Sequence, residues 1–569
     1  EAPKSAEGGD AAAQPEGDRA ARRGRGDGFG GGPGGAAGQP RKSAEELEKE
    51  AIAAIPEKLC YPFGPYALET LPEQQSVVFT NATIWTAGPQ GILENGWLWI
   101  EGGKIKGVGG NGQGTPKVSN ATVVDLKGKH ISPGIIDAHS HTGISRGVNE
   151  GGQAVTAEVR IEDVTNPDDI SWYRQLAGGV TATNNLHGSA NAIGGQNCVN
   201  KVRWGVVHPD QMHFEGAMPG IKFALGENPR QVNGGGGGGF GGGGQSRYPT
   251  TRMGVETLIR DRFTAAKEYM REWHEDSEAQ KGQGKSLGNS LPPRRDLELE
   301  ALAEILQGKR LIHCHSYRQD EILMLCRVAD EFGFKIGTFQ HVLEGYKVAD
   351  EIAKHAIGGS CFTDWWAYKM EVQDAIPQDG PIMAEQGVVV SFNSDSDELA
   401  RRLNVEAGKG IKYGNNVAPN EAIKFVTLNP AKQLMIDKRV GSLEVGKDAD
   451  LAIWSGVPIS SLSRCEATYV DGRKLFSLED DAKAREKIAS ERGRIIQKVL
   501  AQARTGGGAR PEGMGAGGFG GGQGGFGGRR RPPNEEEGAA DMVQYYLDLM
   551  TRGQDPMQAR QGECGVSGN

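Results

Sequence analysis

Short apolar runs alternate with polar turns on both sides of the central part of the chain. Residues 77–125 contain VVFTNATIWTA, GWLWIEGGKIKGVG and ATVVDL, and residues 440–476 contain VGSLEVGKDADLAIWSG and EATYVDGRKLF. Apolar runs bounded by Gly, Asn and Asp are typical of strands. We therefore expect a small composite β-sandwich domain built from residues 77–133 and 436–478.

Between these two pieces the pattern changes to a strand followed by an amphipathic helix, several times over. RLIHCH precedes EILMLCRVADEF, KIGTFQH precedes VADEIAKHA, and GVVVSFNSD is followed by EAIKFVTLNPAKQLM. Successive parallel strands need a crossover connection, which is usually a helix. Residues 134–435 are therefore predicted to form an α/β domain around a parallel sheet, and the pattern alone leaves that sheet open or closed.

Glycine-rich segments interrupt this organisation. Residues 1–58 are a low-complexity extension, residues 232–247 are mostly glycine, and a third block lies within the C-terminal region 479–569. The chain has 87 glycines in 569 residues, roughly twice the usual share of about 7%. Such segments bury too little apolar surface to offset the entropy of ordering, so we expect flexible extensions and a flexible loop. The C-terminal region is predicted to hold a helix, a Gly-rich linker and, at 540–550, a docking helix with apolar residues at helical spacing.

Composition narrows the range of partners. With 37% hydrophobic and 24% charged residues, the chain can form a folded core. Its net charge of −9 provides no general attraction for a polyanion, so no nucleic-acid partner is expected. The sequence has no apolar run of about 18 residues, the length that would suggest a membrane span. The long extensions predict a homo- or hetero-oligomer.

The first residue is Glu1 rather than Met. A removed export signal would explain this start, so we expect a periplasmic or secreted protein, with a cytoplasmic location left open.

Candidate chemistry starts at SPGIIDAHSH, where His139 and His141 follow an apolar strand. Side chains at positions i and i+2 of a strand point the same way, so these two imidazoles can bind one divalent cation. His341 ends the strand KIGTFQH, and Asp395 follows the apolar run GVVVSFN. The spacing therefore predicts a metal site at strand ends.

The order of the motifs carries a family resemblance. SPGIIDAHSH, GSANAIGGQ, PGIKFALGENPR, TRMGVETLIRD and VGSLEVGKDADLAIW occur in that order between residues 77 and 476. Together they resemble the imidazolonepropionase-like branch of the amidohydrolase superfamily. The resemblance implies a (β/α)8 TIM-like barrel that holds two divalent metal ions, with zinc expected, at the C-terminal ends of its strands.

The resemblance also implies a set of ligands. A carboxylated lysine, Lys222, would bridge the two ions, because a carbamate offers two anionic oxygens where an ammonium would repel both cations. Glu227 or Glu215 remains an alternative bridge, and Asp397 remains an alternative to Asp395, two residues away on the same face. The implied ligands are His139, His141, Lys222, His315, His341 and Asp395.

One ligand position is ambiguous from spacing alone. His313 and His315 in RLIHCH share a strand face, and alignment on the following R-x-D-[DE]-I favours His315 as the ligand. His187, which directly precedes GSANAIGGQ, is expected either to touch substrate or to lie incidentally on the surface.

The implied reaction is hydrolysis of an amide C–N bond in a small cyclic amide or a dipeptide-like substrate. Metal-activated hydroxide would attack the carbonyl, with Asp395 as the general base. The chain has SDSD where relatives usually have an Asp followed by His, which leaves a transition-state-stabilising side chain in doubt. Two alternatives stay open: a deaminase of a cyclic amidine with one metal, with Glu321 as the nearest candidate acid/base, and a non-catalytic subunit of an assembly.

Overall fold

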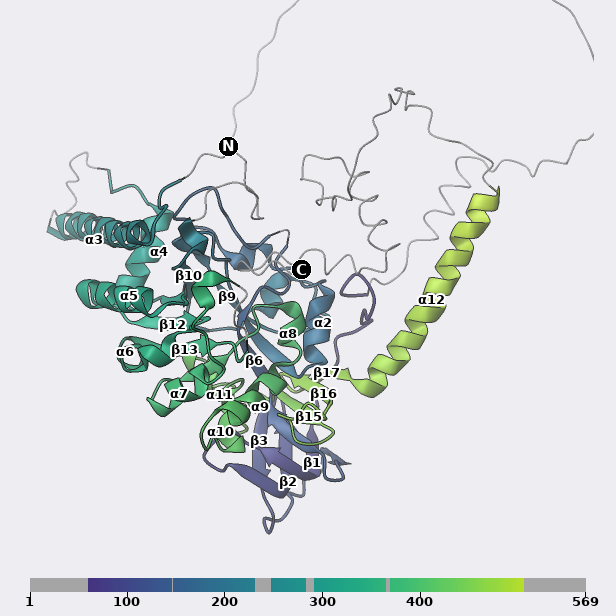
Figure 1. The fold of residues 1–569 in the computed structure, drawn as a ribbon. Helices are drawn as coiled ribbons and strands as arrows, with labels where there is room; N and C mark the ends of the chain where they lie inside the picture. Colours follow the sequence, from purple (N-terminus) through teal and green to yellow (C-terminus); the bar gives the residue numbers. More distant parts are fainter. Residues whose placement is uncertain (1–59, 146, 231–246, 283–290, 365–368, 506–569) are drawn as a thin grey trace, which may run out of the picture. The chain divides into compact units, whose positions relative to one another are not determined.

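The computed structural model describes residues 60–145, 147–230, 247–282, 291–364 and 369–505 (Figure 1). Several predicted features lie outside these described residues: the N-terminal extension, almost all of the glycine-rich loop at 232–247, and the docking helix at 540–550. Those features stay predictions.

The strands from both ends of the described chain form one hydrogen-bonded sheet. The strands run in the order β17-β16-β15-β5-β1-β2-β3, and β4 pairs with β1. The sheet is mixed, because β5 is parallel to β1 and antiparallel to β15. The strands are β1 Val77–Trp85, β2 Ile92–Glu101, β3 Lys104–Gly109, β4 Thr122–Asp125, β5 His130–Pro133, β15 Leu451–Trp454, β16 Cys465–Val470 and β17 Arg473–Ser477.

This sheet has its own apolar core. Phe79, Ile131 and Leu451 belong to one buried cluster, although Leu451 lies more than three hundred residues after the other two in the chain. Alternating apolar positions on β1 and β2 supply six of the fifteen buried residues of that cluster, as strand periodicity requires. The two strand-rich segments of the sequence therefore pair with each other, while the description of this sheet as a sandwich domain stays a prediction.

A second group of strands lies between these segments. Seven of them, β6, β7 and β10–β14, follow the parallel pattern that the sequence predicts. They are β6 Ile135–Ser140, β7 Val180–Asn185, β10 Gly220–Ala224, β11 Leu311–His315, β12 Ile336–Gln340, β13 Ala356–Cys361 and β14 Val390–Phe392.

Two short strands depart from the strand–helix repeat. β8 (Ile193–Gln196) and β9 (Cys198–Lys201) follow one another across Asn197 and run antiparallel to β10 and β7 respectively. The chain returns from β7 through a short loop without a crossover helix, and such a return can only produce antiparallel pairing.

Hydrogen bonds connect the three-stranded sheet β6-β7-β9 to the six-stranded sheet β14-β13-β12-β11-β10-β8 on both sides. On one side, Asn197 N–H donates to Gly220 O at 3.2 Å. On the other side, Asp395 N–H donates to His139 O at 3.0 Å, and Ser394 N–H donates to Asp137 Oδ1 at 3.0 Å.

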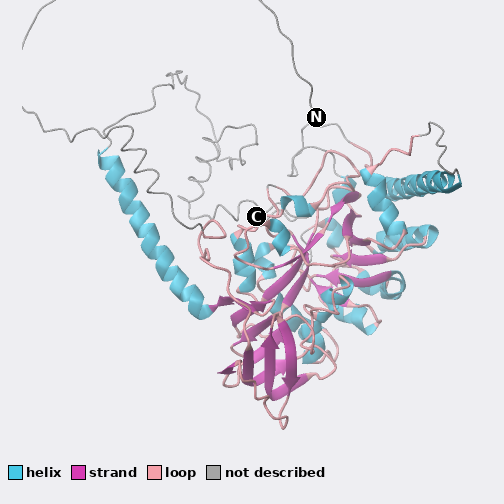
Figure 2. Ribbon diagram, turned by 180° about the vertical axis from the view of Figure 1, so that it is seen from behind, coloured by secondary structure: helices cyan, strands magenta, loops and turns pink. Residues whose placement is uncertain are grey.

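Helices cover the outer side of the strands β12–β14 (Figures 1 and 2). Helix α5 packs near β12, α6 near β13 and α7 near β14, as the predicted repeat requires. The helices are α2 Ile170–Leu176, α3 Arg252–Gly282, α4 Leu297–Leu306, α5 Gln319–Phe332, α6 Ala349–His355, α7 Asp379–Glu385, α8 Asp397–Ala400, α9 Leu403–Tyr413, α10 Pro419–Lys424, α11 Leu428–Gln433 and α12 Leu478–Thr505.

The sheet that contains β5 and β15 is joined directly to the start of β6. Gly134 N–H donates to Asp450 O at 2.9 Å, which joins the strand entry to the segment before β15. A Cβ at Gly134 would lie 2.0 Å from Thr181 Oγ1, so only glycine lets β6 and β7 begin this close together. This close approach explains the Pro-Gly that precedes IIDAHSH.

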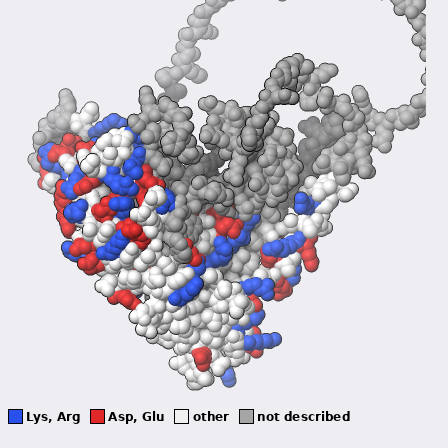
Figure 3. Space-filling view, viewed as in Figure 1, with Lys and Arg blue, Asp and Glu red and all other residues white. Residues whose placement is uncertain are grey.

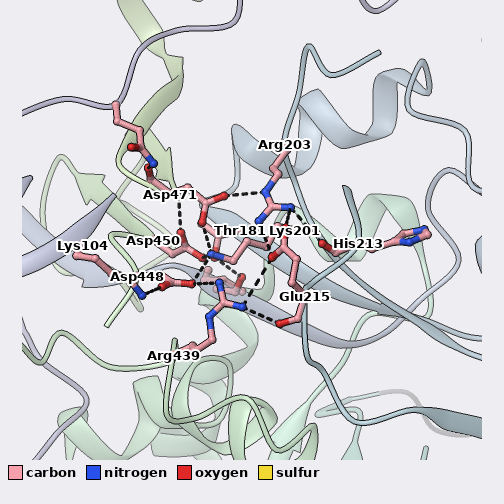
Figure 4. Close-up of polar contacts among 12 residues, drawn as sticks. Lys104, Thr181, Lys201, Arg203, His213, Glu215, Arg439, Asp448, Asp450 and Asp471 are labelled. Atoms are coloured by element: carbon pink, nitrogen blue, oxygen red, sulfur yellow. Dashed lines mark hydrogen bonds and ion pairs between the residues drawn. The ribbon is translucent and has the colours of Figure 1, made fainter. Parts of the chain in front are cut away.

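A buried lysine fastens the sheet to the N-terminal ends of the barrel strands (Figure 4). Lys201 is fully buried, and its ammonium contacts Asp448 Oδ2 at 2.7 Å, Asp450 Oδ2 at 3.0 Å and Asp471. Lys201 pairs with Ala182 near the start of β7, whereas the aspartates belong to the turns around β15 and β16. These ionic contacts join parts of the chain that are about 250 residues apart.

Charged side chains of both signs are interspersed on the face shown in Figure 3, over α3 and along α12. Many form pairs one helical turn apart, such as Arg271 with Glu268 and Glu275, and Lys483 with Glu479. Among the described residues, no helix has the length and apolar character needed to cross a membrane.

Candidate metal centre

Strand ends bring together the six side chains that the sequence singles out. His139 lies on β6, Lys222 on β10 and His315 at the end of β11. His141 directly follows β6, His341 directly follows β12, and Asp395 comes shortly after the end of β14. All of them except His141 are almost completely buried. Parallel strands present their C-terminal ends at one edge, so residues as far apart in the chain as His139 and Asp395 can meet there.

Asp395 is the centre of this cluster. Its Oδ1 lies 3.0 Å from His141 Nε2 and 3.5 Å from His139 Nε2, and its Oδ2 lies 3.4 Å from His341 Nε2. One donor atom each from His139, His141 and Asp395 falls within 4.8 Å of the other two. A single cation can therefore be bound by all three.

Lys222 and His315 extend the cluster. Lys222 Nζ lies 3.2 Å from His139 Nε2. The ring of His315 lies 5.3 Å from that of His341, centre to centre. Four imidazoles, one amine and one carboxylate thus line one continuous buried region.

Neighbouring groups set the orientation of the imidazoles. His141 Nδ1–H donates to Leu186 O at 2.8 Å, which leaves Nε2 as an acceptor that faces Asp395. His139 Nδ1 lies 3.3 Å from Gln340 Oε1, and the Gln340 amide donates to Thr338 Oγ1 at 2.7 Å. Hydrogen bonds of this kind fix the tautomer and ring direction of metal-binding histidines. Gln340 was missed in the sequence, where its signal is a polar residue within an apolar strand.

Burial and neighbouring charges shift the pKa values of His139, His315 and Asp395. Burial, with the positive charge of Lys222, holds the pKa of His139 well below its ordinary value, and burial does the same for His315. Burial acts to raise the pKa of Asp395, but His341 and His141 outweigh it, so this pKa lies below its usual value. Neutral imidazole and ionised carboxylate are the forms that bind a metal ion.

Backbone strain is concentrated at two of these residues. His341 has φ 55° and Asp395 has φ 46°, although neither is glycine. Such values cost free energy for most residues and persist where surrounding structure holds them. Here each residue turns out of a strand end so that its side chain points into the cluster.

Comparisons with known proteins agree with this geometry. Residues 378–489 match the amidohydrolase family. The crystal structure of an amidohydrolase from Thermotoga maritima aligns with a TM-score of 0.61 and 32% identity, covering 70% of this chain and 100% of that one. The chain belongs to the amidohydrolase superfamily. The structural likeness supports a TIM-barrel fold of mixed α/β content, as the motif order implies.

Two curated relatives are similar to the chain over about two thirds of its length. It is 30% identical to Amidohydrolase tasK of Hapsidospora irregularis over 438 residues, which cover 70% of this chain but only 43% of that protein. It is 22% identical to an imidazolonepropionase of Fusobacterium nucleatum, over 68% of this chain and 92% of the relative. The second similarity agrees with the branch that the motifs resemble.

The donor atoms of this amidohydrolase fit a metal. Both ring nitrogens of His315 and of His341 and both carboxylate oxygens of Asp395 are buried and make no hydrogen bond within the part of the chain that the structure describes. Buried polar atoms are nearly always hydrogen-bonded, so such a group of atoms indicates a missing partner. Imidazole and carboxylate ligands match the preferences of zinc.

The structure distinguishes between the two histidines of RLIHCH. His313 Nδ1 bonds to Thr338 Oγ1 at 2.7 Å, one layer deeper between β11 and β12. His315 instead lies beside His341, with Tyr317 at 4.4 Å from its ring centre. The arrangement thus favours His315 as the ligand, in line with the motif alignment.

The structure corrects two carboxylate alternatives. Glu215 pairs with Arg203 in the network around Lys201, at the other end of the strands (Figure 4). Asp397 accepts hydrogen bonds from Thr142 Oγ1 at 2.6 Å and from Ser171 Oγ at 3.3 Å. Sequence position suggested both residues, but strand direction and the turn after Asp395 carry them away from the cluster.

Glu227 and Glu321 also lie outside the cluster of donor atoms. Glu227 lies 3.7 Å from Lys369 Nζ. Glu321 pairs with Arg252 at 2.8 Å and accepts a hydrogen bond from Gly226 N–H. The Glu321 carboxylate therefore holds the segments around it together, which disfavours its role as a deaminase acid/base.

His187 does not lie on the surface, which excludes one of its two expected roles, and its contact with substrate stays a prediction. It is buried, donates from Nδ1 to Gly188 O at 3.0 Å, and accepts from Glu150 N–H at Nε2 at 2.8 Å. A Cβ at Gly194 would lie 2.7 Å from His187 Nδ1, so the GGQ glycines make room for this ring. Burial lowers the pKa of His187 to about 4, and the neutral ring fastens two loops together.

Proposed function

We propose that this chain is a metal-dependent hydrolase that cleaves an amide C–N bond in a small cyclic amide or dipeptide-like substrate. The observation that carries the proposal is the convergence of buried imidazoles with Asp395, whose oxygens make no hydrogen bond with the described residues. Membership of the amidohydrolase superfamily supports hydrolysis at carbon–nitrogen bonds.

The proposal includes a closed barrel. Bonds from Asp395 to His139 and from Ser394 to Asp137 link β14 to β6, and Asn197, directly before β9, links the sheet β6-β7-β9 to β10 through Gly220. A closed barrel fixes the distance between the first and last strands, and both contribute ligands. Burial raises the pKa of Asp137 to about 7, and Ser394 Oγ donates to this carboxyl group at 2.5 Å.

Two divalent ions, with zinc as the first candidate, would be held by His139, His141, Lys222, His315, His341 and Asp395. Ions at this position would supply Lewis-acid activation of water and of the scissile carbonyl. Lys222 would take part as a carbamate. Its amine lies 3.2 Å from His139 Nε2, and carboxylation would replace a cation by an anionic group where dications bind.

Asp395 would move the proton. Its lowered pKa keeps the carboxylate ionised and ready to accept a proton from the attacking water. The same carboxyl group would then give the proton to the leaving nitrogen. Because Asp395 follows β14 in a strained turn, its oxygens are held among the imidazoles throughout.

The substrate class rests on similarity. Imidazolonepropionase is named for an imidazolone, a cyclic amide, and the chain is similar to such a protein over most of that protein's length. Dipeptide-like amides remain within the proposal. Export and assembly through the terminal extensions stay predictions.

The decisive experiment compares two buried lysines. Lys222→Met should bind one metal ion fewer per chain than the wild type after zinc loading, because the bridging carbamate is lost. With 13C-labelled bicarbonate, the wild type should show a carbamate resonance that Lys222→Met lacks. Lys201→Met, altered at the other end of the strands, should keep both the resonance and the metal content.

Equal metal content in both variants, with no carbamate resonance in the wild type, would contradict a lysine-bridged pair of ions. The metal-loaded wild type should then be screened against lactams, N-acyl amino acids and dipeptides. Hydrolysis that chelator abolishes and zinc restores supports the activity, and no turnover of any of these classes contradicts the substrate proposal.

A further inference from the structure

Three groups of His, Cys, Asp and Glu donors with mutual distances within 4.8 Å occur among the described residues. One is the cluster around Asp395. A second, formed by Asp448, Asp450 and Asp471, already surrounds the ammonium of Lys201. The third consists of Glu162, Cys198 and His213, and it has no part in the proposed hydrolysis.

Three separate segments contribute to this third group. Cys198 begins β9 and is 6% exposed. His213 follows the short helix η2 (Pro209–Met212), and Glu162 lies in the short helix η1 (Ile161–Val164). Figure 4 shows the His213 ring directed away from the Lys201 network, so the two groups are distinct.

Two nitrogens in this region are buried without a hydrogen bond. His213 Nε2 and Asn200 Nδ2 have none within the described chain, although an isolated bridge pairs Asn200 with His213. Cys198 Sγ donates to Asn200 Oδ1 at 3.4 Å. An imidazole nitrogen that is buried next to a thiol and a carboxylate, and that makes no hydrogen bond with the described residues, is a donor suited to a metal ion.

We propose that Glu162, Cys198 and His213 bind one divalent cation of the zinc type, separate from the barrel centre. Thiolate, imidazole and carboxylate are the three ligand types that zinc uses in proteins. The Asn200 side-chain oxygen, which already lies next to Cys198 Sγ, or a water molecule completes the coordination. This site differs chemically from the barrel centre, whose six predicted ligands include no sulfur.

The same three residue types could instead form a nucleophilic cysteine with a histidine base, but the surroundings oppose that. Burial raises the pKa of the Cys198 thiol to about 12, and Glu162 adds to this effect. Reactive cysteines have lowered pKa values and partly exposed, electropositive surroundings. A bound cation displaces the thiol proton and compensates the charge of the thiolate. Metal binding therefore suits this buried cysteine better than a nucleophilic role.

The charge of Glu162 is available to a cation. Arg160 Nη1 lies 2.7 Å from Glu162 Oε1, and the same guanidinium makes two hydrogen bonds to Asp163. Two carboxylates thus share one arginine, and the Glu162 side chain is 37% exposed, so it can turn toward Cys198. The ion would tie η1 and the segment after η2 to β9.

Cobalt substitution tests this site with a signal that the barrel centre cannot give. The full chain, loaded with Co²⁺, should show a sulfur-to-cobalt charge-transfer absorption in the near ultraviolet. Cys198→Ser should abolish this absorption and bind one ion fewer per chain. Cys326→Ser removes another buried thiol, on α5, and should leave both unchanged.

Two milder variants keep the test decisive if Cys198→Ser fails to fold. His213→Gln and Glu162→Gln should each weaken cobalt binding at least tenfold in a titration followed by the same absorption. The proposal is overturned if the wild type shows no such absorption, if the absorption persists in Cys198→Ser, or if both milder variants bind cobalt as the wild type does.

Discussion

Two lysines are completely buried, Lys201 at the end of β9 and Lys222 in β10. The ammonium of Lys201 contacts three carboxylates, those of Asp448, Asp450 and Asp471. Lys222 Nζ instead lies 3.2 Å from an imidazole nitrogen, that of His139. A buried charge is costly unless it is paired, and the three aspartates meet that need for Lys201.

The difference separates a structural joint from the proposed metal centre. Around Lys201 the opposite charges are matched within the protein, and this matching fastens the sheet to the barrel strands. Around Lys222 the buried oxygens of Asp395 and the nitrogens of His315 and His341 make no hydrogen bond in the described chain. Sites that bind a ligand are those where the protein alone leaves polar atoms unsatisfied.

The largest effect is expected at the proposed metal centre. In the metal-loaded enzyme, Asp395→Asn should lower kcat by about 10²–10⁴-fold, the usual contribution of a general acid/base. Asp397→Asn is the matched control, since Asp397 is hydrogen-bonded to Thr142 and Ser171 and should lose less than about tenfold. Steady-state kinetics on a substrate from the screen measures both, and equal losses would remove Asp395 from its proton-transfer role.

At the structural joint the expected effect is on stability. Lys201→Met leaves buried carboxylates without their cation and should lower the free energy of unfolding by roughly 3–5 kcal/mol. Urea denaturation followed by circular dichroism measures this loss. A change below about 1 kcal/mol, the range of exposed ion pairs, would mean that Lys201 does not hold the joint.

Acid should weaken the joint through Asp448. Burial acts to raise its pKa, but Lys201, with Lys104 and Arg439, lowers it to about 2. The unfolded value is near 3.9, so this carboxylate stabilises the fold above about pH 4, and the contribution is lost as the pH falls to about 2. The difference in unfolding free energy between wild type and Asp448→Asn should therefore shrink by about 2 kcal/mol over that range.

Asp450 acts in the opposite direction, because burial raises its pKa to about 6. Asp450 is present in both the wild type and Asp448→Asn, so comparing the two proteins at each pH removes most of the contribution of Asp450. A gap between the two proteins that stays constant from pH 4 to pH 2 would show that the Asp448 charge is not stabilised in the folded state.

The smallest effect is expected from Lys104, the exposed partner of Asp448. Lys104 Nζ lies 2.5 Å from Asp448 Oδ1, but its side chain is 43% exposed. Solvent screens such pairs, so Lys104→Ala should cost about 0.2–1 kcal/mol. Thermal unfolding of Lys104→Ala and Lys201→Met compares an exposed and a buried cation that contact the same aspartate. If Lys104→Ala lost as much stability as Lys201→Met, the distinction between exposed and buried partners of Asp448 would be wrong.

Much of the candidate centre could be predicted from the sequence. His139, His141, His341 and Asp395 each stand at the end of an apolar run, and Lys222 lies in a motif of the family resemblance. Strand periodicity and the common direction of parallel strands are local rules, so they bring these residues to one edge before any contact is known. The structure places all of them there.

Other features depended on contacts that no local pattern encodes. His313 and His315 have equal spacing arguments; the motif alignment favours His315, and the pairing of His313 with Thr338 agrees with that preference. Glu215 was a candidate bridge between the two metal ions, but it forms an ion pair with Arg203, which follows the antiparallel strand β9. The antiparallel strands were missed because their apolar pattern is the same in either direction.

The sequence by itself determined the strand–helix repeat, the ligand-bearing strand ends and the superfamily, because apolar periodicity and motif order are properties of neighbouring residues. Only the tertiary structure decided which polar residues meet: the aspartates around Lys201, Gln340 behind His139, and the group Glu162, Cys198 and His213. Their separations in the chain range from 15 to about 270 residues. Such distances are set by strand register and by how the sheets join, and neither is written in a local pattern.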